Sequence, residues 1–196
     1  MIDDVTLFLK NQLNEYLKAQ SGWGSGEPGE ERVTLLDGEN MEPVTFKLGS
    51  ITTLLINIEQ ENVLRPPELF RRALPDGSSL AVQPEIRLNL YVLFVAHFKK
   101  YENGLRALSL IIRYFQNHRV LDPENAPDLP ECVEQLIVEL VTLPFQEQNE
   151  VWNALRATYH PSVLYKVSLV VFRDEEGASL PELDQVDVAL EIAGAK

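Results

Sequence analysis

The stretch EIRLNLYVLFVAHF, residues 85–98, constrains the fold more than any other part of the chain. Polar and apolar residues alternate over its first half, which is the pattern of a β-strand with one buried face. Over its second half both sets of positions are apolar, so both faces of the strand must be covered. We therefore expect residues 85–98 to form the central strand of a sheet with packed layers on both sides.

Predicted helices and strands surround this segment. Apolar residues at steps of three and four predict amphipathic helices over residues 2–19 and 101–119. Alternating patterns predict strands over residues 50–64, 132–143 and 162–172. The order of these elements predicts an α+β fold in which a mixed β-sheet is flanked by helices.

The buried faces and turns are predicted at the level of single residues. Two short apolar runs around DGEN, residues 37–40, predict a β-hairpin within residues 32–49. The strand that follows is expected to carry Leu54, Ile56 and Ile58 on one face. The helix over residues 101–119 is expected to bury Tyr101, Leu105, Leu108, Ile112 and Phe115.

A third helix is predicted before the last of these strands. Pro144 suits its first turn, because proline lacks the N–H that a first turn leaves unpaired. Pro161 excludes the helical conformation from His160 and so closes the helix. The residues expected on its buried face are Gln148, Trp152, Leu155 and Tyr159.

The charge of the chain disfavours two classes of partner. Thirty acidic and 17 basic residues give a net charge of −13, divided as −6 over residues 1–60, +3 over 61–118 and −10 over 119–196. We expect neither nucleic acid nor a membrane as a partner, because both require a basic surface. The basic middle and the acidic ends would allow self-association. The alternative is an acidic surface that only keeps the protein soluble.

The length, the single cysteine and the N-terminal segment predict the number of domains and the location of the protein. A chain of 196 residues suffices for one domain, and its single cysteine, Cys132, is expected to be a buried apolar residue. The N-terminus, MIDDVTLFLKNQL, has acidic residues where a signal peptide needs basic ones, and no apolar run reaches about 18 residues. We therefore expect a soluble protein that is cytoplasmic when made.

Two segments are expected to stand apart from the main core. Residues 64–84 contain four prolines and no sustained period, and such a long connection is either disordered or orders against a neighbour. The segment over residues 174–196 begins as an acidic tether and ends in a strand pattern, which either folds back on its own sheet or pairs with another subunit. We divide the chain into a single α+β domain, residues 1–173, and this tether with its strand. The candidate contacts with a subunit or another partner are Arg65, Arg71, Arg72, Val186, Val188, Leu190 and Ile192.

The sequence predicts no catalytic, metal or cofactor site. His160 and Ser162 are two residues apart, but no Gly-x-Ser-x-Gly turn presents the serine as a nucleophile. His97, His118 and His160 are far apart in the sequence, and none has a second ligand at the spacing of a zinc site. Phosphate-binding and dinucleotide-binding motifs are also missing. A non-enzymatic protein is favoured, with a small hydrolase using Ser162 and His160, or an adaptor for a single partner, as the alternatives.

Four segments together carry a resemblance to a known family: LNLYVLFVAHF, GLRALSLIIRYFQNH, LIVELVTLPFQEQNEVWNAL and YHPSVLYKV. The chain resembles the tail-terminator or tube-cap proteins of extracellular contractile injection systems, phage-tail-like particles of the antifeeding-prophage and virulence-cassette type. The resemblance extends from Ile2 to Phe172 and is densest over residues 86–171. The residues that correspond to the family's typical motif are Trp152, Leu155, Tyr159, Pro161, Ser162, Tyr165 and Lys166.

The resemblance implies a fold similar to that of phage tail-terminator proteins. It also implies a homohexameric ring on the distal end of the inner tube and sheath, which stops their growth and needs no cofactor. The implied partners are other copies of the chain, the tube protein and the sheath protein. Where the family commonly carries an arginine after Tyr-Lys-Val, this chain has Ser168, so the polar contact of such an arginine is not implied here.

Overall fold

The computed structural model describes residues 2–20, 31–36, 44–61, 71–73, 79–81, 87–131 and 133–170. The chain divides into two compact units, residues 1–65 with 85–173, and residues 66–84 with 174–196. The predictions for Arg65, for Cys132 and for the strand at residues 186–192 lie outside the described residues, as do the side chains of Arg71 and Arg72.

The first unit is built on a six-stranded mixed sheet. In sheet order its strands are β1 (Val33–Leu35), β2 (Ser50–Gln60), β5 (Leu88–His97), β8 (Ser162–Val170), β7 (Gln135–Val141) and β6 (Val120–Leu121). The β1–β2 pair is parallel and the other pairs are antiparallel. β5 lies between β2 and β8, and residues 92–96 are buried on both faces, so the prediction of a central, doubly covered strand is confirmed.

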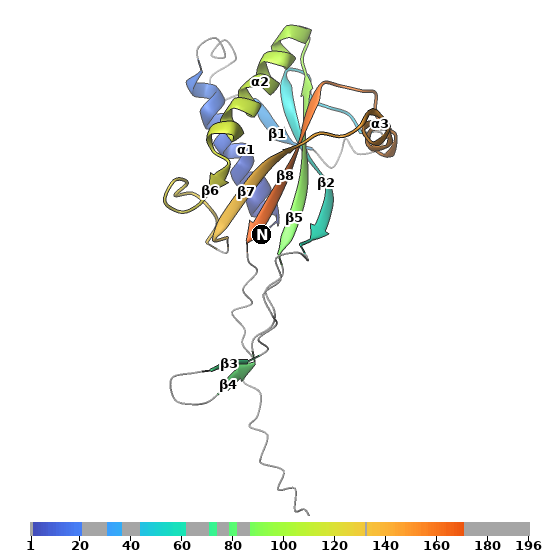
Figure 1. Ribbon diagram of the computed structural model, residues 1–196. Coiled ribbons are helices and arrows are strands. Elements are labelled where there is room, and N and C mark those ends of the chain that lie inside the picture. Colours follow the sequence, from blue (N-terminus) through green and yellow to red (C-terminus); the bar gives the residue numbers. More distant parts are fainter. Residues whose placement is uncertain are drawn as a thin grey trace, which may run out of the picture. The chain divides into compact units, whose positions relative to one another are not determined.

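Helices cover both faces of this sheet. α1 (Ile2–Ala19) and α2 (Tyr101–Asn117) pack on one face, and α3 (Phe145–Ala154) lies on the other (Figure 1). The main hydrophobic core lies between the sheet and the first two helices, and a smaller core lies beneath α3. The α+β fold is therefore confirmed. None of the helices in the described ranges is long and apolar enough to cross a membrane.

The buried side of α1 follows the predicted period. Val5, Leu9, Leu13 and Leu17 are all fully buried. Asn14 on the same side is also buried and holds the edge strand: its Nδ2 donates to the Val33 carbonyl at 2.8 Å, and its Oδ1 accepts the Arg32 and Val33 N–H groups at 2.9 Å. One side chain thus supplies backbone groups near the start of β1 with hydrogen bonds, as buried polar groups require.

The hairpin predicted within residues 32–49 is wrong for the part of it that the structure describes. β1 pairs in parallel with β2, with Val33 opposite Ile51, and the next apolar run contributes only an isolated bridge at Val44. Residues 45–49 of that run form no strand, and residues 37–43 lie outside the described ranges. The pattern predicted strand character for β1, but a run of three residues carries no information on its partner.

The predicted face of β2 is correct only in its first half. Leu54 is buried in the smaller core and Ile56 packs against it, whereas 46% of Ile58 is exposed. A bulge between Leu55 and Asn57 inserts one extra residue, so Ile58 pairs with Leu90 and belongs to the opposite face. A bulge reverses the alternation of faces, and no sequence pattern in this strand reveals it.

The predicted buried face of α2 is correct for Leu108 and Phe115, but the helix is rotated so that the other three predicted residues are exposed. Tyr101 is 65% exposed, and Leu105 and Ile112 are exposed as well. The side that packs on the core holds Gly104, Ala107, Leu108, Leu110, Ile111, Tyr114 and Phe115. A Cβ added to Gly104 would lie 3.5 Å from the Ala96 Cβ, so the small residues turn toward the sheet and allow a close approach.

The third helix is shorter than predicted. α3 ends at Ala154. Arg156 has a positive φ of 52°, which is incompatible with a right-handed helix, so the helix does not continue to Pro161. Tyr159 is therefore 62% exposed instead of lying on a buried helical face. Pro144 precedes the first helical residue and does not stand within the first turn.

The second unit contains one described feature. β3 (Arg71–Ala73) pairs antiparallel with β4 (Ser79–Ala81). The connection over residues 64–84, predicted from its prolines to lack a sustained period, thus includes a short pair of strands.

Candidate functional site: the sheet face beneath α3

The aromatic side chains beneath α3 form one cluster. Trp152, the one residue that α3 buries, lies edge-on to Phe46 with a centroid distance of 6.0 Å. His160 lies between these rings and β5: its centroid is 5.3 Å from Phe46 and 6.2 Å from Trp152. This cluster joins the segment before β2 to the helix and to the start of β8.

The sheet brings two histidines together in this cluster. The rings of His97 and His160 lie 4.7 Å apart, and His97 Nδ1 is 2.8 Å from the Phe46 carbonyl oxygen. Burial, and secondly the charge of His97, lower the pKa of His160 below its ordinary value. A neutral imidazole is therefore favoured at His160. His118 lies elsewhere, stacked on Tyr114 at the end of α2.

Among the described residues, Ser162 makes no hydrogen bond to a base. Ser162 lies in β8 opposite Val95 and lines a cavity of about 270 Å³ with Trp152 and Val151. In the described part of the chain, no hydrogen bond joins Ser162 to His160, and no three metal-binding side chains gather. Nucleophilic catalysis requires a base within hydrogen-bond reach of the hydroxyl, and the described residues place none in a hydrogen bond with Ser162.

The other half of the same face is polar. Asn89 is buried, accepts a hydrogen bond from Ser168 Oγ at 2.6 Å and donates one to Glu61 Oε2 at 2.9 Å. Tyr91 donates a hydrogen bond to Glu59 Oε2 at 2.8 Å. This hydrogen bond is the main cause that raises the pKa of Tyr91, and burial is the second. Ser168 thus makes a polar contact of its own on this face.

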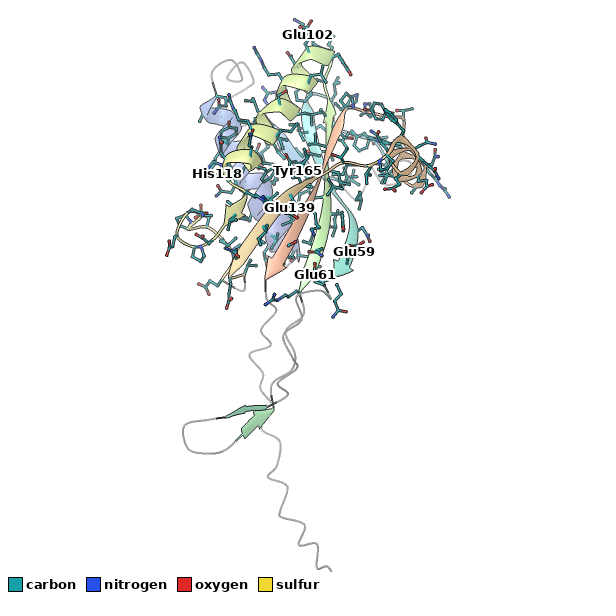
Figure 2. The ribbon with its side chains drawn as sticks, in the orientation of Figure 1. Glu59, Glu61, Glu102, His118, Glu139 and Tyr165 are labelled. Carbon is teal, nitrogen blue, oxygen red and sulfur yellow. The ribbon has the colours of Figure 1, made fainter. Side chains whose placement is uncertain are left out.

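Charged side chains continue this polar half across β7. Glu139 forms an ion pair with Arg119, and Lys166 Nζ lies 3.8 Å from Glu139 Oε2. Figure 2 shows Glu59 and Glu61 near the ends of β2 and β5, with Glu139 on β7. These charged side chains are at least partly exposed, and together they form a surface with both positive and negative charge. They do not concentrate charge of one sign into an anion-binding or cation-binding site.

The residues of the predicted motif do not share one surface. Trp152, Leu155, Ser162 and Lys166 belong to the α3 side of the sheet. Tyr165 points into the main core, where its ring lies 4.7 Å from Phe115, and burial raises its pKa to about 12. The motif is therefore divided between the two cores, as alternation along β8 requires.

Sequence reasoning missed His97 and Phe46 as members of the aromatic cluster. His97 ends the apolar run of β5, and Phe46 follows a segment for which a hairpin was predicted. Their meeting with His160 depends on the antiparallel pairing of β5 with β2 and β8, which places Ser50 opposite His97 and Ser162 opposite Val95. No spacing along the chain carries this information.

Comparison with known proteins decides the family. A sequence model of the Pvc16 N-terminal domain matches residues 4–183, which is most of the chain. The chain belongs to the Pvc16 N-terminal domain family. The resemblance inferred from the sequence is thereby confirmed. A comparison with curated proteins found no match.

Two solved structures share the fold of this Pvc16 N-terminal domain protein. One is the cryo-EM structure of the PVC sheath/tube terminator of an extracellular contractile injection system in the extended state, with 14% identity and a TM-score of 0.58 over 100% of this chain. The other is the tube-terminating cap of the anti-feeding prophage, with 14% identity and a TM-score of 0.52 over 92% of this chain. The matches span 65% and 59% of those two chains.

Proposed function

We propose that this Pvc16 N-terminal domain protein ends the inner tube and sheath of a contractile injection particle as a homohexameric ring. The observation that supports this most strongly is the likeness of its whole chain to the fold of a sheath/tube terminator. Family membership over residues 4–183 and the similar fold of a tube-terminating cap support it independently of that single match.

The proposed role is structural and needs no reaction. A terminator acts by occupying the last assembly surface of a polymer and presenting no surface for the next subunit. The aromatic cluster around Trp152 and His160 suits this role, because its rings pack α3 onto the sheet. In this proposal the protein is made in the cytoplasm and is then incorporated into the particle.

The domain division predicted from the sequence becomes part of the proposal. Residues 1–173 form the cap domain, and residues 174–196 act as a tether whose terminal strand contacts a neighbouring subunit or the sheath. The period-two pattern of Val186, Val188, Leu190 and Ile192 supports a strand there. The arginines at positions 65, 71 and 72 are proposed as further contacts of this kind.

Deletion of the gene in its own host, followed by electron microscopy of purified particles, tests the proposal. We expect tubes and sheaths of irregular length, or sheaths contracted in the absence of a trigger, and we expect the wild-type gene to restore uniform particles. A Ser162→Ala gene should restore them equally, because the proposed role uses no nucleophile. Particles of normal length and normal ends in the deletion strain would overturn the proposal.

A further inference from the structure

The rotation of α2 leaves an apolar stripe on the outside of the first unit. Tyr101, Leu105 and Ile112 are 65%, 43% and 36% exposed, and Leu108 lies between them at the border of the core. We name these four residues the α2 stripe. Their spacing of four, three and four residues is the spacing of a seam that packs against another helix.

The α2 stripe lies on the side of α2 away from α1. Arg113 of α2 donates hydrogen bonds to Tyr16 Oη and to Gln20 Oε1, so the side of Arg113 is the one that meets α1. The stripe lies about 100° around the helix from that side, as α-helical geometry at 3.6 residues per turn requires. Within the described residues, no helix packs on the stripe.

The sheet face that α2 covers also carries an exposed apolar side chain. Leu140 in β7 is 52% exposed and pairs with Tyr165, whose ring packs against Phe115 at the border of the same side of α2. Leu140 is therefore a second exposed apolar position on the sheet face that α2 covers.

Among the described elements, α3 fits this surface best. It buries only Trp152 in its own subunit, and its first residue, Phe145, is 91% exposed. Its ten residues measure about 15 Å, and the α2 stripe from Tyr101 to Ile112 measures about 17 Å at 1.5 Å per residue. An exposed aromatic side chain on a helix of matching length is a suitable anchor for an apolar seam.

The charges of the two surfaces are complementary. α2 and the two residues before it carry one acidic side chain, Glu102, and four basic side chains, Lys99, Lys100, Arg106 and Arg113. α3 carries two acidic side chains, Glu147 and Glu150, and no basic side chain. Charge of opposite sign favours an α2–α3 contact between copies and disfavours an α2–α2 contact.

We propose that the α2 stripe of one copy binds α3 of the next copy, so that the subunits associate head to tail. α2 and α3 cover opposite faces of the sheet (Figure 1), so one subunit offers both halves of the contact in different directions. Such a heterologous contact generates a closed ring when its rotation closes. The inference rests on the proposed function, because it supplies the contact from which the proposed ring is built.

Disulfide trapping in the full-length chain tests this contact directly. The variant Leu105→Cys/Phe145→Cys, made with Cys132→Ser, is assembled on particles, oxidised and separated without reductant. We expect a ladder of covalent multimers ending at the ring size, and either cysteine alone should give none. Dimers from Leu105→Cys alone would indicate a symmetric α2–α2 contact, and a cross-link to the tube or sheath protein would identify a different occupant. Either result would overturn the inference.

A matched pair of charge substitutions provides a second measurement. Leu105 and Leu7 are both 43% exposed, and only Leu105 belongs to the α2 stripe. Leu105→Glu should weaken self-association by at least about tenfold, whereas Leu7→Glu should leave it unchanged. Both variants must keep the wild-type melting temperature. Equal association of the two variants would contradict the inference.

The outcomes separate the inference from the proposed function. Rings at particle ends that neither cross-link nor respond to Leu105→Glu would overturn only the α2–α3 contact. A protein that forms no ring and is missing from particle ends would overturn the proposed function and this inference with it.

Discussion

The imidazole rings of His97 and His160 lie 4.7 Å apart beneath α3, with the Phe46 and Trp152 rings beside His160. Protonation would place positive charge in an apolar cluster and next to a second imidazole. Burial and the charge of His97 accordingly keep the pKa of His160 below its ordinary value.

We predict that this pair makes the folded state sensitive to acid. Because the folded pKa of His160 is lowered, the unfolded chain binds more protons below about pH 6.5, and the free energy of unfolding falls as the pH decreases through that value. Melting temperatures from about pH 8 to about pH 5 should decline less in His160→Gln than in the wild type. Parallel curves for the two proteins would show that His160 does not contribute.

Trp152 and Ser162 separate the structural account of this face from a catalytic one. Trp152 is 5% exposed and its ring packs against three others, so Trp152→Ala should lower the free energy of unfolding by about 3–5 kcal/mol. Ser162→Ala should change it by less than about 1 kcal/mol. Urea titrations of both variants measure these values. A hydrolase activity lost in Ser162→Ala would contradict the structural account.

Asn14 should be the most sensitive polar position of α1. Its side chain makes three hydrogen bonds with the backbone of Arg32 and Val33, so Asn14→Ala leaves buried groups without partners. We expect a loss of about 1–3 kcal/mol in the free energy of unfolding. The exposed Asn11 on the same helix is the matched control, and Asn11→Ala should be nearly neutral. Equal losses for the two variants would contradict the role assigned to Asn14.

Truncation after Arg173 tests the proposed division of the chain. If residues 174–196 contact a neighbour, the truncated protein should keep the melting temperature of the full chain and lose attachment to particles. Thermal melting and co-sedimentation with particles provide the two readouts. A truncated protein that no longer folds would show that the terminal strand completes its own sheet.

Sequence periodicity correctly predicted the elements in which one apolar pattern continues over many residues. α1 and β5 have one consistent pattern over many residues, and burial at Leu9 or at Phe94 follows from it directly. The α2 sequence supports two overlapping apolar faces, and the choice between them depends on the close approach of Gly104 to β5, which periodicity does not describe.

The candidate site was less accessible to sequence reasoning than the fold. Trp152 and His160 were identified from their local pattern, but His97 and Phe46 reach them only through strand pairing. The bulge before Asn57 and the parallel pairing of β1 are likewise set by tertiary contacts. The family resemblance supplied the terminator hypothesis, which composition and spacing alone did not distinguish from a single-partner adaptor.

The most direct test of the central claim is the position of the protein on intact particles. Particles from a host that expresses an epitope-tagged full-length chain are labelled with gold-conjugated antibody and imaged by electron microscopy. The account predicts label at one end of each extended tube and sheath, with six copies per particle by quantitative mass spectrometry. Label distributed along the sheath, or particles that lack the protein, would contradict it.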